Sequence, residues 1–230
     1  MVRQERAVRT RRAVLEAAAA VFAEHGYTAA TVADILKTAG VTKGALYFHF
    51  DSKEALARGI LELQTDQVVP EREIKLQEMV DLAMSVACRL KEDPLLRAGA
   101  RLSADPVGRG QYGSAWPLWV GVLSEILTEA HRRGETLAHV VPTEVAEMVV
   151  SSFNGVQLFA QMESGLRDVE HRVSVLLKYV LPSVASPAVL MRLDVAEDRG
   201  ARVLAEMAPA ETQTDTGAAE QGRGPVAIPA

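Results

Sequence analysis

The stretch TKGALYFHF, residues 42–50, decides the fold that this sequence predicts. A helix of about two turns begins at Thr42, because its hydroxyl can accept hydrogen bonds from the free backbone N–H groups of a first turn. The polar and aromatic residues that follow have no obvious core of their own to fill. A short, capped helix that presents Lys43, Tyr47 and His49 to an external surface is typical of a recognition helix.

The residues upstream complete a helix-turn-helix. Apolar residues recur at helical spacing between residues 13 and 22, and Gly26 ends that first helix. Thr31 and Asp34 have the spacing of a capping box, which opens a second helix. Gly40 then provides the tight turn, because glycine readily adopts the positive φ that the turn needs. The third helix is too short to be stable alone, so the first and fourth helices are expected to pack around it.

This stretch resembles the DNA-binding domain of the TetR family of transcriptional repressors. The resemblance is carried by residues 26–27, 31–35, 39–41, 44–50 and 52–56, and it covers the first quarter of the chain. It implies a DNA-binding domain over residues 1–50, in which Lys43 and Tyr47 contact phosphates. The predicted DNA-binding residues are Thr42, Lys43, Gly44, Ala45, Tyr47, His49, Lys53, Arg3, Arg6 and Arg9. Among them, Thr42, Ala45 and His49 are expected to reach base edges or the DNA backbone.

The distribution of charge favours a nucleic-acid partner although the total does not. The chain carries a net charge of −5, yet residues 1–53 hold eight basic and five acidic residues, which gives +3. The remaining residues hold 17 basic and 25 acidic residues, which gives −8. A basic head on an acidic body orients the molecule toward phosphate. The alternative is that the N-terminal arginines only solubilise a frayed end.

The composition predicts a cytoplasmic, all-α protein. Hydrophobic residues make up 48% of the 230, and no strand-like alternation of any length is visible. No apolar run approaches the ~20 residues of a membrane span, and the Arg-rich start does not resemble a signal peptide. Cys88 is the only cysteine, so it forms no internal disulfide and is expected to be a small buried hydrophobe.

Helical periodicity extends along most of the chain. The helix after the head is expected over residues 51–69, with Asp51 as its cap, and further helices over 76–90, 93–103, 115–133, 142–162, 168–181 and 187–207. Residues 106–113 are expected to form a flexible loop. We therefore predict a helical ligand-binding and dimerisation domain over residues 51–207, followed by a disordered tail over residues 208–230.

Catalysis has no support in the sequence, and no cofactor is expected. His131, Glu135 and His139 are spaced four apart, which on one helix would align three metal ligands. Gly134 breaks the helix between them, so we predict no metal site. A Gly-rich phosphate loop, a Gly-x-Ser-x-Gly elbow and a Cys-x-x-Cys pair are all absent from the sequence.

Two residues of the body invite a functional interpretation beside a structural one. Trp119 lies on an apolar helix, where it is either a core aromatic or part of the wall of a cavity. Gln64 interrupts an apolar helix, so it is either an exposed polar residue or a polar group directed into an apolar pocket. The residues alone leave both alternatives open.

A narrower resemblance bears on this choice. The body resembles the γ-butyrolactone-type autoregulator receptors, a TetR subgroup from antibiotic-producing bacteria, at Gln64, residues 97–103, Trp119, residues 134–140, residues 153–157, Gln161, residues 168–172 and residues 181–183. It implies that Trp119 packs against a bound lactone and that Gln64 helps to position it. Phe159 and Met162 complete the predicted ligand site. Some members of the subgroup have a hydroxyl residue in place of Met162, which cannot donate a hydrogen bond, so the ligand can differ here.

Together these patterns predict a homodimeric repressor of a pseudo-palindromic, double-stranded DNA operator, released by a small lactone-like signal. Helices over residues 143–163 and 168–181 would form a four-helix interface with their two-fold mates. A ligand would shift the fourth helix and change the separation of the two heads. The alternatives are a TetR-type regulator that activates or answers to another ligand, such as an antibiotic, and a helical enzyme.

Overall fold

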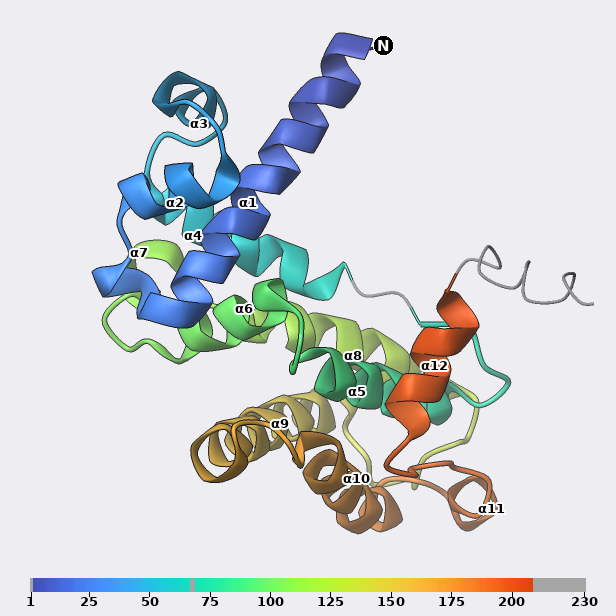
Figure 1. Cartoon of the computed structure of the whole chain (residues 1–230). Helices are drawn as coiled ribbons and strands as arrows, with labels where there is room; N and C mark the ends of the chain where they lie inside the picture. Colours follow the sequence, from blue (N-terminus) through green and yellow to red (C-terminus); the bar gives the residue numbers. More distant parts are fainter. Residues whose placement is uncertain (1, 67–68, 209–230) are drawn as a thin grey trace, which may run out of the picture.

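The computed structural model describes residues 2–66 and 69–208, and within these ranges its regular secondary structure is helical, with no strand (Figure 1). The prediction of an all-α fold is confirmed. The only β-type pairing among the described residues is an isolated bridge between Thr136 and Ala185. No helix in these ranges is long and apolar enough to cross a membrane.

The head consists of α1 (Val2–Ala29), α2 (Val32–Ala39) and α3 (Lys43–His49). Gly26 interrupts α1 with a φ of 78°, and Gly40 closes α2 with a φ of 62°, as expected of glycine in the left-handed region. Thr31 and Asp34 form the predicted capping box. Hydrogen bonds from the Thr31 side chain and backbone hold the pKa of Asp34 below its usual range, so a negative charge stands at the start of α2.

The helix after the head is shorter than predicted. α4 (Lys53–Glu62) is capped by Ser52 rather than Asp51, because the Ser52 hydroxyl accepts the Ala55 N–H at 3.1 Å. A 3-10 turn, η1 (Leu63–Thr65), follows it, so the helix ends well before Val69. The turn directs Gln64 into the protein interior, where its side chain is only 3% exposed.

The body is built around α5 (Lys75–Arg89), which is buried along most of its length. α8 (Trp116–Arg132) and α10 (Val169–Val180) pack against it, and α6 (Pro94–Ala104), α9 (Pro142–Ser164) and the 3-10 turn η2 (Leu181–Ser183) complete the body. The predicted loop over residues 106–113 contains a one-turn helix, α7 (Arg109–Tyr112). Figure 1 shows α9 and α10 side by side on the face of the body away from the head.

The single helix predicted over residues 187–207 is wrong. Two helices, α11 (Pro187–Leu190) and α12 (Arg199–Met207), are separated by an irregular segment. The physical reason is a contact distant in sequence: the Asp194 N–H donates to the Gln77 carboxamide oxygen at 2.8 Å, and the Gln77 nitrogen donates to the Asp194 carbonyl at 3.1 Å. A backbone held by a side chain of α5 in this way does not continue a helix.

A buried ion cluster fastens α12 to α5. The Asp81 side chain is fully buried and accepts two hydrogen bonds from Arg199, at 2.7 and 2.6 Å, and one from Arg72, at 2.7 Å. Arg72 also donates to Glu206 of α12 at 2.6 Å. Burial raises the pKa of the Asp81 carboxyl, but hydrogen bonds from Arg199, Gln77 and Arg72 outweigh it and hold the pKa below its usual range.

Two apolar cores lie side by side. The core of the head includes Phe22, Ile35 and Leu46, but it also takes in residues of α4 and α6, such as Ile60 and Leu102. The core of the body lies between α5, α8, α9 and α10. Trp119 of α8 packs against both cores. The residues predicted as a tail lie outside the described residues from 209 onward.

Candidate DNA-binding surface and ligand cavity

The recognition helix α3 is held by its inner face and leaves its outer face free. Leu46 is 1% exposed in the core of the head, while Gly44 and Lys43 are exposed. The Lys43 ammonium lies 5.8 Å from the centre of the Tyr47 ring, and that ring is 42% exposed. The pair therefore places one cation and one phenol hydroxyl on the same side of the helix.

The other predicted contacts on α3 lie along its opposite flank. The Thr42 hydroxyl accepts the Ala45 N–H at 3.2 Å, which confirms the predicted cap. Ala45 and His49 are half-buried. One short helix and its cap therefore contain six of the predicted DNA-binding residues: Thr42, Lys43, Gly44, Ala45, Tyr47 and His49.

Lys53 has a different place from the one predicted. Its ammonium donates to the carbonyl of Tyr27 at 2.8 Å and to the carbonyl of Ala30 at 3.0 Å. It also lies 4.3 Å from the centre of the Tyr27 ring. These contacts compensate the free carbonyls at the end of α1, so the structure shows a structural role for Lys53 that the sequence did not indicate.

The basic N-terminus is the first part of α1. Arg6 and Arg9 are exposed on this helix, which projects past the rest of the head (Figure 1). The Arg3 side chain lies outside the described residues. Basic residues at the start of a helix do not compensate its dipole, so they contribute little to folding and remain available to an anionic partner.

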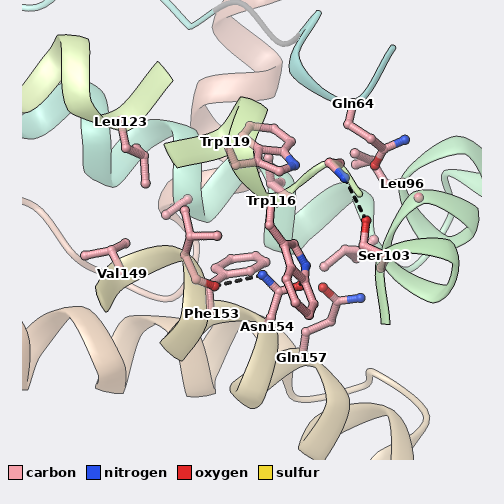
Figure 2. Close-up of a pocket in the computed structure, with 17 residues that line it drawn as sticks. Gln64, Leu96, Ser103, Trp116, Trp119, Leu123, Val149, Phe153, Asn154 and Gln157 are labelled. Atoms are coloured by element: carbon pink, nitrogen blue, oxygen red, sulfur yellow. Dashed lines mark hydrogen bonds between the residues drawn. The ribbon is translucent and has the colours of Figure 1, made fainter. Parts of the chain in front are cut away.

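A cavity of about 70 Å³ lies where η1, α5, α6, α8 and α9 meet (Figure 2). Its lining contains no ionisable side chain, and its polar groups are amides, one hydroxyl and two indoles. The lining residues are Gln64, Ala83, Val86, Leu90, Leu96, Gly99, Ala100, Ser103, Ala115, Trp116, Trp119, Leu123, Val149, Val150, Phe153, Asn154 and Gln157.

Gln64 forms one wall of this cavity and ties α4 to α6. Its carboxamide nitrogen donates to the carbonyl of Ile60 at 3.1 Å and to the carbonyl of Leu95 at 2.8 Å. The carboxamide lies directly against Gly99 of α6, where a Cβ atom would overlap it. Because Gly99 has no side chain, it leaves the space that the Gln64 carboxamide occupies.

The two tryptophans enter the cavity from α8 (Figure 2). The Trp116 indole nitrogen donates to the Asn154 side-chain oxygen at 3.1 Å, and the Asn154 nitrogen donates to the Val150 carbonyl at 2.7 Å. The Ser103 hydroxyl accepts the Ala115 N–H at 3.0 Å. These polar groups are therefore already oriented by the protein.

The cavity adjoins a wider groove of about 1240 Å³ between α6, the end of α1 and α9. Ala100, Trp116, Val150, Asn154 and Gln157 line both spaces. Trp116 and Asn154 consequently lie between the cavity and the groove.

Phe159 and Met162, which were predicted to line the ligand site, do not lie in this cavity. They are 53% and 77% exposed on α9. The Arg172 guanidinium of α10 lies 4.8 Å from the centre of the Phe159 ring. The structure thus brings Gln64 and Trp119 together but places these two apolar residues on the outer surface formed by α9 and α10.

Glu135, considered as a metal ligand, has a structural role. Its carboxylate accepts the N–H groups of Lys75 and Leu76 at 3.0 and 2.9 Å, which caps the start of α5. His131 shares a 2.7 Å hydrogen bond with Thr136. Among residues 2–66 and 69–208, no group of three or more acidic, His or Cys side chains could hold a metal ion.

Sequence reasoning missed Ser103, Trp116 and Asn154 as cavity residues. A signal was present for one of them, since Trp116 lies about one turn before Trp119. Residues about one turn apart share a helix face, so one lining residue indicates the next. Nothing in the sequence indicated that Gly99 would accommodate Gln64.

Comparisons with known proteins agree with this architecture. Residues 14–60 match the family of bacterial regulatory proteins named tetR. The chain is 38% identical over 242 residues to the A-factor receptor protein of Streptomyces griseus, which covers 97% of this chain and 87% of that protein. The crystal structure of TylP, a TetR regulator from Streptomyces fradiae, is 41% identical with a TM-score of 0.82, covering 87% of this chain and 98% of that one. A crystal structure of a γ-butyrolactone receptor, an ArpA-like protein, is 27% identical with a TM-score of 0.62 and coverages of 87% and 98%.

Proposed function

This chain belongs to the TetR family of bacterial regulatory proteins, and we propose that it is a repressor that binds a pseudo-palindromic operator as a homodimer and is released by a small γ-butyrolactone-like molecule. Its 38% identity to the A-factor receptor protein over almost the whole chain supports the assignment of both the head and the body. The relatives are regulators, so we also propose that the protein is not an enzyme and acts in the cytoplasm, where the chromosome lies.

The observation that carries this proposal is the path of α4. The helix begins at Lys53, three residues after the end of the recognition segment at Phe50, and the turn after it places Gln64 in the cavity wall. Ten helical residues span about 15 Å. A molecule entering the cavity therefore meets a residue on the turn that directly follows α4, so displacement of this turn would be passed along α4 to the DNA-binding surface. Movement of Gln64 would move the head.

The apolar surface of α9 and α10 supports the dimer. Large apolar residues are exposed there on adjacent helices: Leu158, Phe159, Met162, Val175 and Tyr179. Contiguous exposed apolar surface marks an interaction site, and a two-fold pair buries the same patch on both subunits. Two heads related by this axis would meet successive major grooves. Sedimentation as a dimer at micromolar concentration is expected, and a monomer would contradict the palindromic operator.

The ligand must be accommodated by a change in the cavity. Its volume of about 70 Å³ is well below the ~300–1,000 Å³ of typical ligand pockets. An apolar lining with amide and hydroxyl groups suits a neutral molecule with an alkyl chain and a few oxygen acceptors, which describes a substituted lactone. Gln64 and Trp119 are the proposed contacts, and entry of the ligand would separate the Gln64 side chain from α6.

A second candidate is a regulator of the same family that answers to a larger molecule, such as an antibiotic. The observation in its favour is the adjoining groove of about 1240 Å³, which shares Trp116 and Asn154 with the cavity. A ligand filling both spaces would be much larger than a simple lactone.

Binding measurements separate these candidates. An operator is first selected from random duplex DNA with the purified full-length protein, and its affinity is measured by fluorescence anisotropy. A synthetic 2-acyl-γ-butyrolactone with an eight-carbon chain and a panel of antibiotics are then titrated into the complex. Release by the lactone supports the first candidate, and release by an antibiotic alone supports the second. If no DNA sequence is selected, the repressor proposal fails.

A further inference from the structure

Phe48 is the most exposed large hydrophobic residue of the recognition helix. Its side chain is 79% exposed, although Leu46, two residues before it, is buried. Successive helical residues are about 100° apart, so Phe48 lies about 200° around the helix from Leu46. The same geometry places Gly44 opposite Leu46 on the other side. Gly44 and Phe48 therefore form the outermost ridge of α3, directly opposite its buried face.

The ridge consists of unobstructed backbone at Gly44 and one projecting apolar side chain, Phe48. A Cβ atom at Gly44 would meet nothing within 4 Å, so this part of the helix presents bare backbone. Phe48 contacts the edge of the His49 ring, with the ring centres 5.0 Å apart, and otherwise extends from the surface. Lys43 and Tyr47 stand together on one flank of the ridge. A basic flank beside an apolar ridge fits a helix that enters a groove between phosphates.

The chemistry of the phenyl ring limits what it can recognise. It has no hydrogen-bond donor or acceptor for a base edge or a phosphate. In the major groove, the one apolar group that a base pair presents is the C5-methyl of thymine, which makes apolar contacts with side chains such as phenylalanine. Contact between this methyl and Phe48 would remove apolar surface of both from water.

We propose that Phe48 determines part of the operator sequence by packing against a thymine methyl in each half-site, with Gly44 allowing the helix to approach closely. This inference rests on the proposed function, because it requires the head to enter the major groove. It differs from the contacts expected of Lys43 and Tyr47, which hold phosphates and carry no sequence information.

Uracil substitution tests this proposal directly, because uracil lacks only the methyl group. In the operator selected with the wild-type protein, each thymine is replaced by uracil at symmetric positions in both half-sites. At one position we expect wild-type affinity to fall about fourfold per half-site, which corresponds to the loss of one buried methyl. Phe48→Ala should bind the thymine operator more weakly and should bind the thymine and uracil forms equally at that position. Phe48→Leu should retain the discrimination.

Val107 provides a matched control, since it is an apolar side chain of similar exposure, 76%, in the body and not in the head. Val107→Ala should leave affinity and uracil sensitivity unchanged. Phe48→Ala and Val107→Ala should each melt within about 2 °C of the wild type, because neither Phe48 nor Val107 is buried. The proposal is overturned if no thymine is sensitive to uracil in the wild type, or if Phe48→Ala keeps the discrimination. A wild-type protein that selects no sequence would instead contradict the proposed function.

Discussion

Replacing Gly99 with alanine tests whether Gln64 connects α4 to α6 as the structure describes. The new Cβ would overlap the carboxamide of Gln64, so that side chain must move. The carboxamide is the flexible end of its side chain, and it can shift without disturbing the backbone. The shift nevertheless breaks the hydrogen bonds from Gln64 to the carbonyls of Ile60 and Leu95.

The magnitude follows from two opposing contributions. Leaving a buried polar group without its partner costs about 1–3 kcal/mol. Alanine in place of glycine inside a helix stabilises by about 0.5–1 kcal/mol. Gly99→Ala should therefore destabilise the wild-type protein by about 1 kcal/mol, or about 2–4 °C in melting temperature for a chain of this size. In a Gln64→Ala background the overlap with the carboxamide is removed, and the same substitution should stabilise by about 0.5–1 kcal/mol.

A double-mutant cycle measured by urea denaturation detects whether the effect of Gly99→Ala on the free energy of unfolding changes sign between the two backgrounds. The two substitutions should show a coupling energy of about 1–2 kcal/mol, as expected for residues in direct contact. An equal effect of Gly99→Ala in both backgrounds would refute the contact. Gly121→Ala is the matched control, because Gly121 lies inside α8 with open space around it, and this variant should be stabilised in either background.

Four further outcomes follow from the site and the fold. Trp119→Ala should leave DNA binding intact but raise the lactone concentration needed for release, since the indole contributes on the order of a few kcal/mol if fully buried against the ligand; a stable variant with an unaltered response in the anisotropy titration would exclude the contact. Lys43→Ala should weaken selected and random DNA alike and lower the slope of affinity against salt by about one unit per half-site, and an unchanged salt titration would count against a phosphate contact. Removing residues 1–9 should reduce DNA affinity with little change in melting temperature, because the buried residues of α1 begin at Val14; loss of folding would instead make the segment structural. Asp81→Asn should cost about 3–5 kcal/mol in urea denaturation. Because the pKa of Asp81 is lowered in the folded state, its contribution should also disappear as the pH falls below ~4, and a stability that stays constant from pH 7 to pH 3 would contradict this.

Local features of the head were predictable because their causes are local. The capping roles of Thr31 and Thr42 depend on residues three positions away, and the turns at Gly26 and Gly40 depend on the backbone freedom of a single residue. Interactions between residues this close in the sequence can be recognised from the sequence alone. The same is true of the apolar periodicity that located most helices of the body.

Features that depend on distant contacts were not predictable. Lys53 reads as a free cation in the sequence, and only the folded head brings its ammonium to the carbonyls of Tyr27 and Ala30. Phe159 and Met162 lie on a helix that has one face toward the core, another toward the cavity and a third toward the surface. Apolar character alone does not distinguish these faces. The sequence therefore could not show that Phe159 and Met162 lie on the exposed face of α9 and not in the wall of the cavity.

The arrangement around α6 indicates how the effect of ligand binding would be transmitted to the head. Gly99 supports the Gln64 end of α4, while Arg101, two residues later, donates to the carbonyls of Ala23 and Glu24 in α1 at 2.9 and 3.1 Å. These two contacts of α6 with the head lie close together in the sequence, beside the apolar core that α6 shares with the head. A ligand that separates Gln64 from Gly99 releases only the first of them, since Arg101 lies outside the cavity. The head would then rotate over its remaining contacts with α6, next to Gly26 where α1 is interrupted, and such a rotation would change the separation of the two recognition helices in a dimer.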